Sequence, residues 1–266
     1  MGNTTKIGWT IQPDGTLGAT WNPWRGCAKI DVGCSRCYMF TEQKRWGHDP
    51  RVVVRSTTTF DAPLRWREPR RIFTCSWSDW FIARADPWRA DAWAIIGATP
   101  QHTYMILTKR HERIAAHLPW AGAPWANVWL GVSVADRNGL VRLDALRAAP
   151  AALRFVSFEP LLEDLGAVDL SGIDWAIIGG ESGPRARRCD LGWVRSLQAQ
   201  CRAQRVPTFI KQMGAFTVDC MTYGKHDHPF ECERIRWRDP KGATLGEWPE
   251  EFRVQEFPDG QGRLSL

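Results

Sequence analysis

The stretch TYMILT, residues 103–108, is a short apolar run that contains a β-branched residue and ends on a hydroxyl side chain. Runs of this length between polar or turn residues are typical of buried β-strands. Similar runs occur as RIFTCS at 71–76, VWLGVSV at 128–134, RFVSFE at 154–159, WAIIGGE at 175–181 and TFIKQM at 208–213. With LGATWNP at 17–23, which precedes a cysteine-rich loop, the sequence predicts seven strands.

Three stretches with helical spacing of apolar residues lie between these strands. They cover residues 86–99, 137–149 and 190–204, and the last two begin at the helix-capping residues Asp136 and Asp190. Continuous apolar strands that alternate with helices indicate a parallel sheet covered by helices. We therefore predict an α/β protein with a complete or partial (β/α) TIM-like barrel, in preference to an open dinucleotide-binding fold.

The pattern of strands and helices stops after Gly214. Residues 215–266 are rich in Gly, Pro and charged side chains, which favours short strands or irregular structure. We predict a barrel domain over residues 1–214 and a C-terminal extension over residues 215–266.

The composition favours a cytoplasmic protein with no membrane segment. The first residues lack a basic start followed by an apolar run, and eighteen apolar residues never occur in succession. In a reducing compartment we expect all eight cysteines to be thiols. The 35 Lys and Arg residues exceed the 29 Asp and Glu residues, which suits either a polyanionic partner or a solvated basic surface. The sixteen tryptophans suit core packing better than stacking on bases.

Polar side chains gather at the ends of the predicted strands, where a parallel barrel places its active face. They are Ser76, Ser78 and Asp79; Thr108, Lys109 and Arg110; Ser133; Glu159; Glu181 and Ser182; and Lys211 and Gln212. Thr108 and Ser133 suit helix capping equally well. The long charged side chains in this set need a partner, a ligand or solvent.

Cys27, Cys34 and Cys37 form a C-x6-C-x2-C pattern in the loop after the first predicted strand. A tetrahedral zinc site needs four ligands, for which His48 and Cys75 are the next candidates along the chain. An iron–sulfur cube held by three thiolates keeps one iron open for a small molecule. The position of the loop at the active edge favours the cluster over structural zinc or plain buried thiols.

Seven motifs resemble, in this order, a phage-associated family of unknown function related to the radical S-adenosylmethionine (SAM) superfamily. They are TWNPWRGCAKIDVGCSRCY, SWSDWF, MILTKR, WLGVSV, RFVSFEPLL, WAIIGGESG and FIKQMG, within residues 17–214. The C-x2-C-Y ending also resembles spore photoproduct lyase, a DNA-repair enzyme. The resemblance implies a [4Fe-4S] cluster on Cys27, Cys34 and Cys37 that binds SAM, receives one electron from a reductant and generates a radical that abstracts hydrogen from a substrate.

The resemblance also implies roles for the strand-end residues. Ser76, Ser78 and Asp79 are expected to bind the SAM ammonium group, Lys109 its carboxylate and Ser133 its ribose. We assign Gly179, Gly180 and Glu181 to close approach around adenosine or substrate. Glu159 and Lys211 are expected to handle the substrate or a radical intermediate, and Cys75 is either a hydrogen-atom donor or a small buried thiol.

We therefore expect a radical SAM enzyme whose preferred substrate class is nucleic acid, acting in base modification or repair. The alternative is a non-catalytic nucleic-acid-binding module with a structural zinc site. A further set of metal ligands is conceivable in the extension, where Cys220, His226, His228 and Cys232 occur close together in the sequence.

Overall fold

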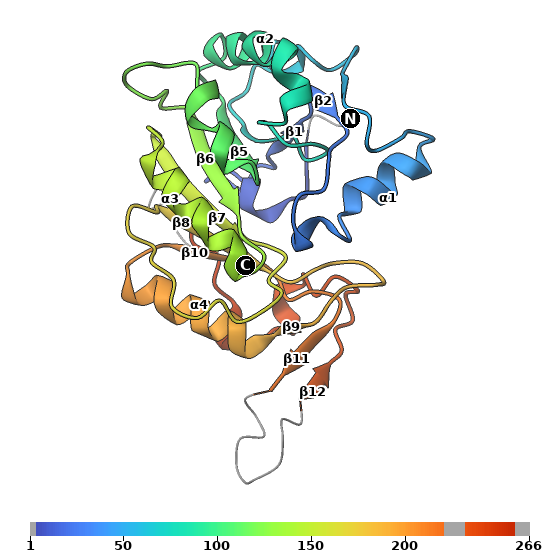
Figure 1. Ribbon diagram of the computed structural model, residues 1–266. Coiled ribbons are helices and arrows are strands. Elements are labelled where there is room, and N and C mark those ends of the chain that lie inside the picture. The colour runs from blue at the N-terminus through green and yellow to red at the C-terminus, as the bar shows by residue number, and fades with distance from the viewer. Residues whose placement is uncertain (1–3, 221–231, 259–266) are drawn as a thin grey trace. The chain divides into compact units, whose positions relative to one another are not determined.

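A computed structural model describes residues 4–220 and 232–258 of the chain (Figure 1). Its main element is a seven-stranded sheet in the order β1-β4-β5-β6-β7-β8-β10. The strands are β1 (Ala19–Trp21), β4 (Arg71–Thr74), β5 (Thr103–Thr108), β6 (Val128–Ser133), β7 (Leu153–Phe158), β8 (Trp175–Gly179) and β10 (Thr208–Gln212). All seven strands coincide with the runs that the sequence predicts.

The order of this sheet follows the order of the chain, which is the singly wound arrangement of a β/α barrel. A doubly wound dinucleotide fold would reverse direction at a switch point. Pairing is parallel between β1 and β4, β4 and β5, β5 and β6, and β8 and β10. Because β1 and β10 stand at opposite ends of the order, the structure confirms a partial β/α barrel-like fold.

The α-helices are α1 (Tyr38–Arg45), α2 (Asp86–Gly97), α3 (Val141–Ala148) and α4 (Leu191–Ala203). Asp136 and Asp190 act as caps, as predicted: their side chains accept hydrogen bonds from the backbone N–H of Gly139 and Gly192 respectively. Between β5 and β6 the chain forms only the short 3-10 helices η5 (His111–Arg113) and η6 (Ala115–His117). The alternating sequence pattern predicts a helix-like stretch between consecutive strands, and this prediction is wrong after β5 and after β7, where the described residues form no α-helix.

Smaller elements complete the described structure. A two-stranded antiparallel sheet joins β2 (Trp24–Arg25) to β3 (Val54–Arg55), and a three-stranded sheet has the order β12-β11-β9. The latter contains β9 (Cys189–Asp190), β11 (Thr217–Asp219) and β12 (Glu233–Ile235). The other 3-10 helices are η1 (Gly8–Thr10), η2 (Val32–Cys34), η3 (Ala62–Arg65), η4 (Ala83–Ala85), η7 (Arg137–Leu140), η8 (Leu245–Glu247) and η9 (Glu250–Phe252).

The chain divides into two compact units. Unit 1 comprises Met1–Val132 and Arg142–Phe155, and unit 2 comprises Ser133–Val141 and Val156–Leu266. The core of unit 1 contains a chain of indole rings: Trp80 lies 5.9 Å from Trp21, 5.0 Å from Trp24 and 4.9 Å from Trp93, measured between ring centroids. This packing confirms the preferred interpretation of these tryptophans as core residues.

In unit 2, helix α4 packs against β8, β10 and β11. A second aromatic cluster brings together Trp175, Phe209 and Phe257, with centroid distances of 5.4–6.1 Å. The described part of residues 215–266 belongs to this unit, since β11 pairs in parallel with β9 and Phe257 joins the aromatic cluster.

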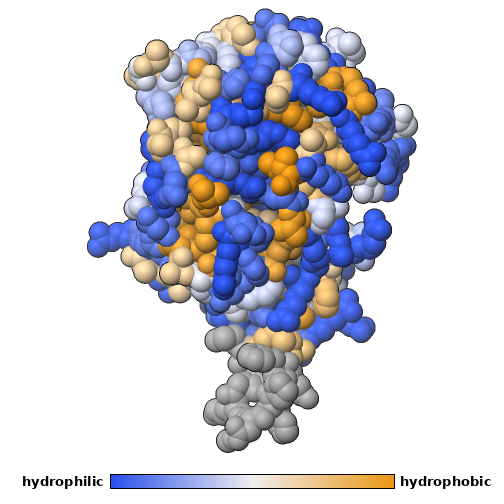
Figure 2. Space-filling model, in the orientation of Figure 1, coloured by the Kyte–Doolittle hydropathy of each residue, from blue (hydrophilic) through white to orange (hydrophobic). Residues whose placement is uncertain are grey.

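The surface carries few large apolar side chains. The face in Figure 2 is mainly hydrophilic, and its hydrophobic residues form separate patches. Within residues 4–220 and 232–258, no helix has both the length and the hydrophobicity needed to cross a membrane.

Candidate metal centre and strand-end residues

The segment between β2 and α1 carries Cys27, Cys34 and Cys37 and is called the cysteine loop below. It begins at Gly26, directly after β2. Gly26 has a φ of +91°, and a Cβ atom at this position would lie 2.1 Å from the carbonyl oxygen of Val52. The position therefore requires glycine because two segments of backbone approach each other closely. The close approach at Gly26 is therefore to the protein's own backbone at Val52.

Cys34 is the last residue of η2, and Cys37 directly precedes α1. The Asp31 side chain accepts a hydrogen bond of 3.0 Å from the Cys34 N–H and so caps η2. Cys37 precedes the first residue of α1, where the N–H groups of Met39 and Phe40 interact with its sulfur. Such contacts favour a thiolate, but burial outweighs them and raises the pKa of Cys37.

The SWSDW segment after β4 holds both ends of the cysteine loop. Ser78 Oγ donates a 2.6 Å hydrogen bond to the Gly26 carbonyl, and the Tyr38 hydroxyl donates a 2.7 Å bond to the Ser76 carbonyl. Trp77 also holds the loop and the helix after it. Its backbone carbonyl accepts a hydrogen bond from the Gly26 N–H, and its indole Nε1 donates one to the Glu42 carboxylate in α1. The sequence singled out Ser76 and Ser78 as SAM contacts, and the structure shows each holding the loop.

Asp79 is almost completely buried, and both of its carboxylate oxygens are occupied. Oδ1 accepts from the Phe81 N–H and from the Thr108 hydroxyl, at 2.9 and 2.7 Å. Oδ2 accepts from the Lys109 N–H and faces the Arg110 guanidinium, each at 3.0 Å. Asp79 thereby joins the ends of β4 and β5, and it orients Arg110.

Arg110 links this strand end to the first cysteine. Its Nη2 donates a 2.8 Å bond to the Ala28 carbonyl, and the guanidinium also bonds to the sulfur of Cys27. Burial raises the pKa of Cys27 to about 12, although Arg110 opposes that change. Without a bound cation, Cys27 is therefore a neutral thiol at pH 7.

Two further cations, Lys109 and Arg142, contact the loop at Asp31, which lies between Cys27 and Cys34. Its Oδ2 is 3.1 Å from Lys109 Nζ and 2.7 Å from Arg142 Nη2. Burial tends to raise the pKa of Asp31, but Lys109, the Cys34 N–H and Arg142 together lower it to about 2. Lys109, predicted to bind the SAM carboxylate, thus neutralises a carboxylate of the cysteine loop.

Cys75 occupies a strained position at the end of β4. Its φ of +56° lies in the left-handed region, which residues other than Gly seldom adopt. Its side chain is buried, and burial raises the pKa of its thiol well above the ordinary value. Backbone strain of this kind is concentrated at functional sites, which keeps Cys75 among the candidates beside the loop.

The three loop sulfurs are not gathered around a single point in the structure. Within residues 4–220 and 232–258, the only three ligand atoms of His, Cys, Asp or Glu within 4.8 Å of one another come from Asp190, Cys220 and Cys232. Around one tetrahedral zinc with Zn–S bonds of about 2.3 Å, sulfur atoms lie about 3.8 Å apart. The sulfurs of Cys27, Cys34 and Cys37 do not all lie within 4.8 Å of one another.

Unit 2 holds a separate ion pair at its strand ends. Lys211 Nζ lies 2.6 and 2.9 Å from the two carboxylate oxygens of Glu159. Both side chains are partly exposed, and Ser133 Oγ donates a 3.0 Å bond to the Glu159 carbonyl. The structure thus brings together three predicted residues, from β6, β7 and β10.

The predicted Gly-Gly-Glu segment has contacts that arise within unit 2. A Cβ on Gly180 would lie 2.2 Å from the Met213 carbonyl oxygen, whereas one on Gly179 would make ordinary contacts at 3.5 Å with Gln212 and Glu159. Glu181 accepts hydrogen bonds from the backbone and guanidinium of Arg187. The tight approach at Gly180 is therefore to a neighbouring strand end, and Glu181 has a protein partner.

Sequence reasoning missed three residues that organise the cysteine loop. Asn22 bonds to the Ser76 hydroxyl, while Asp31 and Arg142 form the ion pair described above. Asp31 lay inside the C-x6-C gap, where its position three residues before Cys34 is a helix-capping signal. Arg142 is 111 residues away from its partner in the chain, and no local pattern marks it.

The expectation that all eight cysteines are thiols is wrong, because Cys220 and Cys232 form a disulfide. The register of β11 and β12 explains this pairing: Asp219 faces Glu233, so residues 220 and 232 are the next facing positions. His226 and His228, the other two proposed ligands in this segment, lie outside the described residues.

A family model described as "Protein of unknown function (DUF5131)" matches residues 4–240. The chain belongs to the DUF5131 family. The matched region includes the cysteine loop and all strands of the seven-stranded sheet in this DUF5131 protein. No curated protein and no solved structure matches the chain. The resemblance to a family of unknown function is thus confirmed, while the relation to radical SAM enzymes and to spore photoproduct lyase stays a prediction.

Proposed function

We propose that this protein is a radical SAM enzyme that uses a three-cysteine [4Fe-4S] cluster to abstract hydrogen from a substrate. One observation carries the proposal: three half-buried thiols of a single loop are fastened to the ends of β4 and β5 and are flanked by buried cations. An anionic group with three thiolate ligands suits this environment in both charge and ligand type.

The donor set consists of three thiols from a single loop. A [4Fe-4S] cluster that keeps one iron open takes three protein ligands, whereas a structural zinc ion takes four. Metal binding requires thiolates, and the raised pKa values of Cys27 and Cys37 mean that binding must release protons. When bound, a cluster of this type presents an open iron to the amino and carboxylate groups of SAM and supplies the electron that cleaves it.

In this proposal the residues around the loop act as positioning residues. Asp79 holds Arg110 toward Cys27, and Asp31 holds Lys109 and Arg142 against the loop. Arg110 favours negative charge on the sulfur of Cys27, Lys109 favours it on the sulfur of Cys37, and the ion pairs draw the loop onto the strand ends. Ser76, through its backbone carbonyl, and Ser78, through its hydroxyl, also hold the loop, in place of the direct SAM contacts that the sequence suggested.

Residues of unit 2 are proposed to bind the substrate or adenosine. The Glu159–Lys211 pair combines a carboxylate and an ammonium group that solvent can reach. Such a pair can hold or transfer a proton, or bind a polar group of the substrate. Ser133, Gly179, Gly180 and Glu181 line the same strand ends, β6 and β8, and stay proposed contacts for adenosine or substrate.

Nucleic acid is the proposed substrate class, since exposed cations and an exposed aromatic ring occur at α1 and the loop after it. Lys44, Arg45 and Arg51 are exposed, and the neighbouring Trp46 is 68% exposed. Cations contact phosphates and an exposed indole can stack on a base. In the Arg-rich segments RWREPRR (65–71) and RARRC (185–189), Arg71 is buried and Arg187 and Arg188 are paired with carboxylates, so these three arginines contribute less.

The test is production of 5′-deoxyadenosine from SAM by anaerobically reconstituted protein in the presence of dithionite. We expect turnover by the wild type and by Cys201→Ala, which removes a buried thiol of α4, and none by Cys34→Ala. A protein that binds iron and sulfide but never forms 5′-deoxyadenosine would contradict SAM cleavage. Stoichiometric zinc without iron would instead favour the binding-module alternative.

A further inference from the structure

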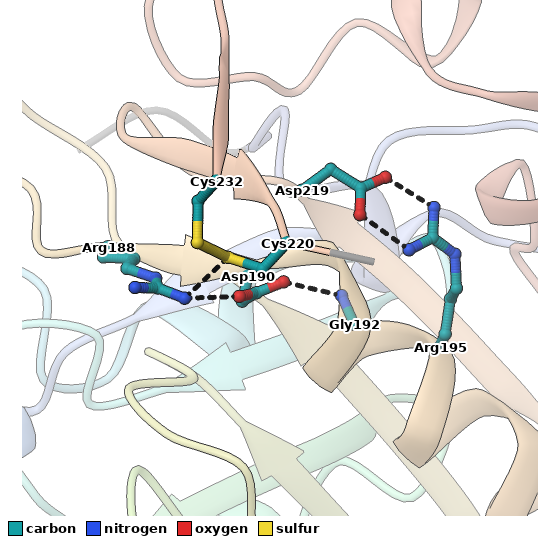
Figure 3. The surroundings of a disulfide bond; sticks show 7 residues. All are labelled: Arg188, Asp190, Gly192, Arg195, Asp219, Cys220 and Cys232. Atoms are coloured by element: carbon teal, nitrogen blue, oxygen red, sulfur yellow. Dashed lines mark hydrogen bonds and ion pairs between the residues drawn. A yellow bond between two sulfur atoms is a disulfide. The ribbon is translucent and has the colours of Figure 1, made fainter. Parts of the chain in front are cut away.

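The disulfide between Cys220 and Cys232 lies in a setting suited to thiol–disulfide exchange. The two residues face each other one position beyond the last pair of β11 and β12, with their Cα atoms 4.2 Å apart (Figure 3). Both cysteine residues are partly exposed to solvent. The ladder thus holds the two sulfurs near each other independently of the bond between them.

A cation is held against one of the two sulfurs. Arg188 Nη2 lies 2.8 Å from Cys220 Sγ and 2.6 Å from Asp190 Oδ2. Figure 3 shows the guanidinium meeting both groups from the same side. In the described ranges this contact is made to Cys220 and not to Cys232, so the two sulfurs are chemically unequal.

The cation is fixed in place by the start of α4. Asp190 is buried, and its Oδ1 accepts a 2.9 Å bond from the Gly192 N–H, while Oδ2 holds Arg188. Arg195, one turn further along α4, binds Asp219 through two hydrogen bonds of 3.0 and 2.7 Å. The start of α4 therefore secures Arg188 through Asp190 and secures Asp219, which precedes Cys220, so Arg188 is preorganised to stabilise a thiolate at Cys220.

We propose that Cys220 and Cys232 form a reversible disulfide that exchanges with small thiol–disulfide couples such as glutathione, with Cys220 as the sulfur released as a thiolate. An incoming thiolate attacks the Cys232 sulfur, the Cys220–Cys232 bond breaks, and Cys220 leaves as a thiolate beside Arg188. A second thiolate then attacks the mixed disulfide and releases Cys232. Two electrons pass from two small thiols to the protein, the small thiols become a disulfide, and the protein sulfurs take up protons.

The same geometry disfavours a metal ion at this position. Asp190, Cys220 and Cys232 bring three ligand atoms within 4.8 Å of one another. However, both oxygens of Asp190 are already bonded, and Arg188 places a positive charge where a metal cation would have to bind. The arrangement suits a thiolate better than a metal complex.

The experiment equilibrates the full chain with graded mixtures of reduced and oxidised glutathione, starting from both the reduced and the oxidised protein. After acid quenching and differential alkylation, peptide mass spectrometry gives the fraction of the Cys220–Cys232 disulfide. We expect the same two-electron titration curve from both directions. Two results would overturn the proposal. One is that Cys220 and Cys232 remain fully open to alkylation in oxidised glutathione; the other is that their disulfide is reduced only when the protein unfolds.

Alkylation rates of the reduced protein at pH 7 test the role of Arg188. We expect Cys220 to react several-fold faster than Cys232, and Arg188→Gln to remove most of that difference. Arg202→Gln is the matched control, because it removes an exposed positive charge from the last turn of α4. Equal rates for the two cysteines in the wild type would overturn the assignment even if a variant fails to fold, as would zinc binding that protects both from alkylation.

Discussion

Lys109 Nζ lies 3.1 Å from Asp31 Oδ2, which joins the residue after β5 to the middle of the cysteine loop. Arg142 reaches the same oxygen at 2.7 Å, and all three side chains are largely buried. A buried carboxylate with two cationic partners is stable only while its partners remain in place. This relationship fixes the segment between Cys27 and Cys34 and is the basis of the first prediction.

Asp31→Asn is expected to loosen the cysteine loop. The amide keeps the size of the side chain but leaves Lys109 and Arg142 buried without a negative partner, so the free energy of unfolding should fall by about 2 kcal/mol. Urea denaturation measures the change, and iron bound after reconstitution should fall with it. Asp49→Asn, at an exposed aspartate of the same region, is the control. An Asp31→Asn protein as stable as the wild type would contradict the role of this ion pair.

Gly26→Ala is expected to destabilise the cysteine loop at its first residue. A methyl group would meet the Val52 carbonyl at 2.1 Å on a residue with a φ of +91°. We expect a loss of roughly 3 kcal/mol in the free energy of unfolding, from the strained backbone and from the displacement it forces. Gly122→Ala serves as the comparison, since a Cβ there has no neighbour within 4 Å. Equal stability of the two variants would refute the close approach.

The Glu159–Lys211 pair can be tested by a double-mutant cycle of Glu159→Gln and Lys211→Met. Because the pair is partly exposed, we expect a coupling free energy of about 1 kcal/mol from denaturation. If the pair also handles the substrate, the double variant should regain stability relative to the single variants without regaining turnover. Recovery of both would show that the pair is structural only.

His102 should make stability depend on pH. It is fully buried, its Nε2 donates to the Pro63 carbonyl, and its Nδ1 has no hydrogen-bond partner in the described residues. Burial lowers the pKa of His102 below its usual 6.5, so the folded state resists protonation that the unfolded state accepts. The free energy of unfolding should therefore fall as the pH decreases through about 6.5. Between pH 7.5 and 5.5, the free energy of unfolding should fall less for His102→Gln than for the wild type. An equal fall in the two proteins would contradict the assignment of this pH dependence to His102.

The sequence predicted the main sheet well because buried parallel strands carry their own signal. Runs such as TYMILT and WAIIGG are mainly apolar and carry no charged residue, and Asp136 and Asp190 mark the beginnings of helices by local capping. The connection after β5 was harder to predict, since its 3-10 turns lack a strong periodic pattern. Local spacing therefore identified the elements that form the fold.

The contacts of the site were less accessible to sequence reasoning because they join distant segments. The position of Asp79 and Lys109 at the ends of predicted strands marked them as site residues. It could not show that Asp79 has four hydrogen-bonding or ionic partners or that Lys109 is paired with Asp31. The disulfide depends on the register of two strands in the extension, which has no clear periodicity. These relationships arise from tertiary packing.

The central claim concerns the three loop cysteines, and iron and sulfide analysis with an absorption spectrum tests it most directly. The protein is purified without oxygen, reconstituted with iron and sulfide, and compared with Cys34→Ala. We predict about four irons and four sulfides per chain with a broad band at about 400 nm, both lost in the variant. Stoichiometric zinc, or iron content that is unchanged by Cys34→Ala, would contradict a cluster held by Cys27, Cys34 and Cys37.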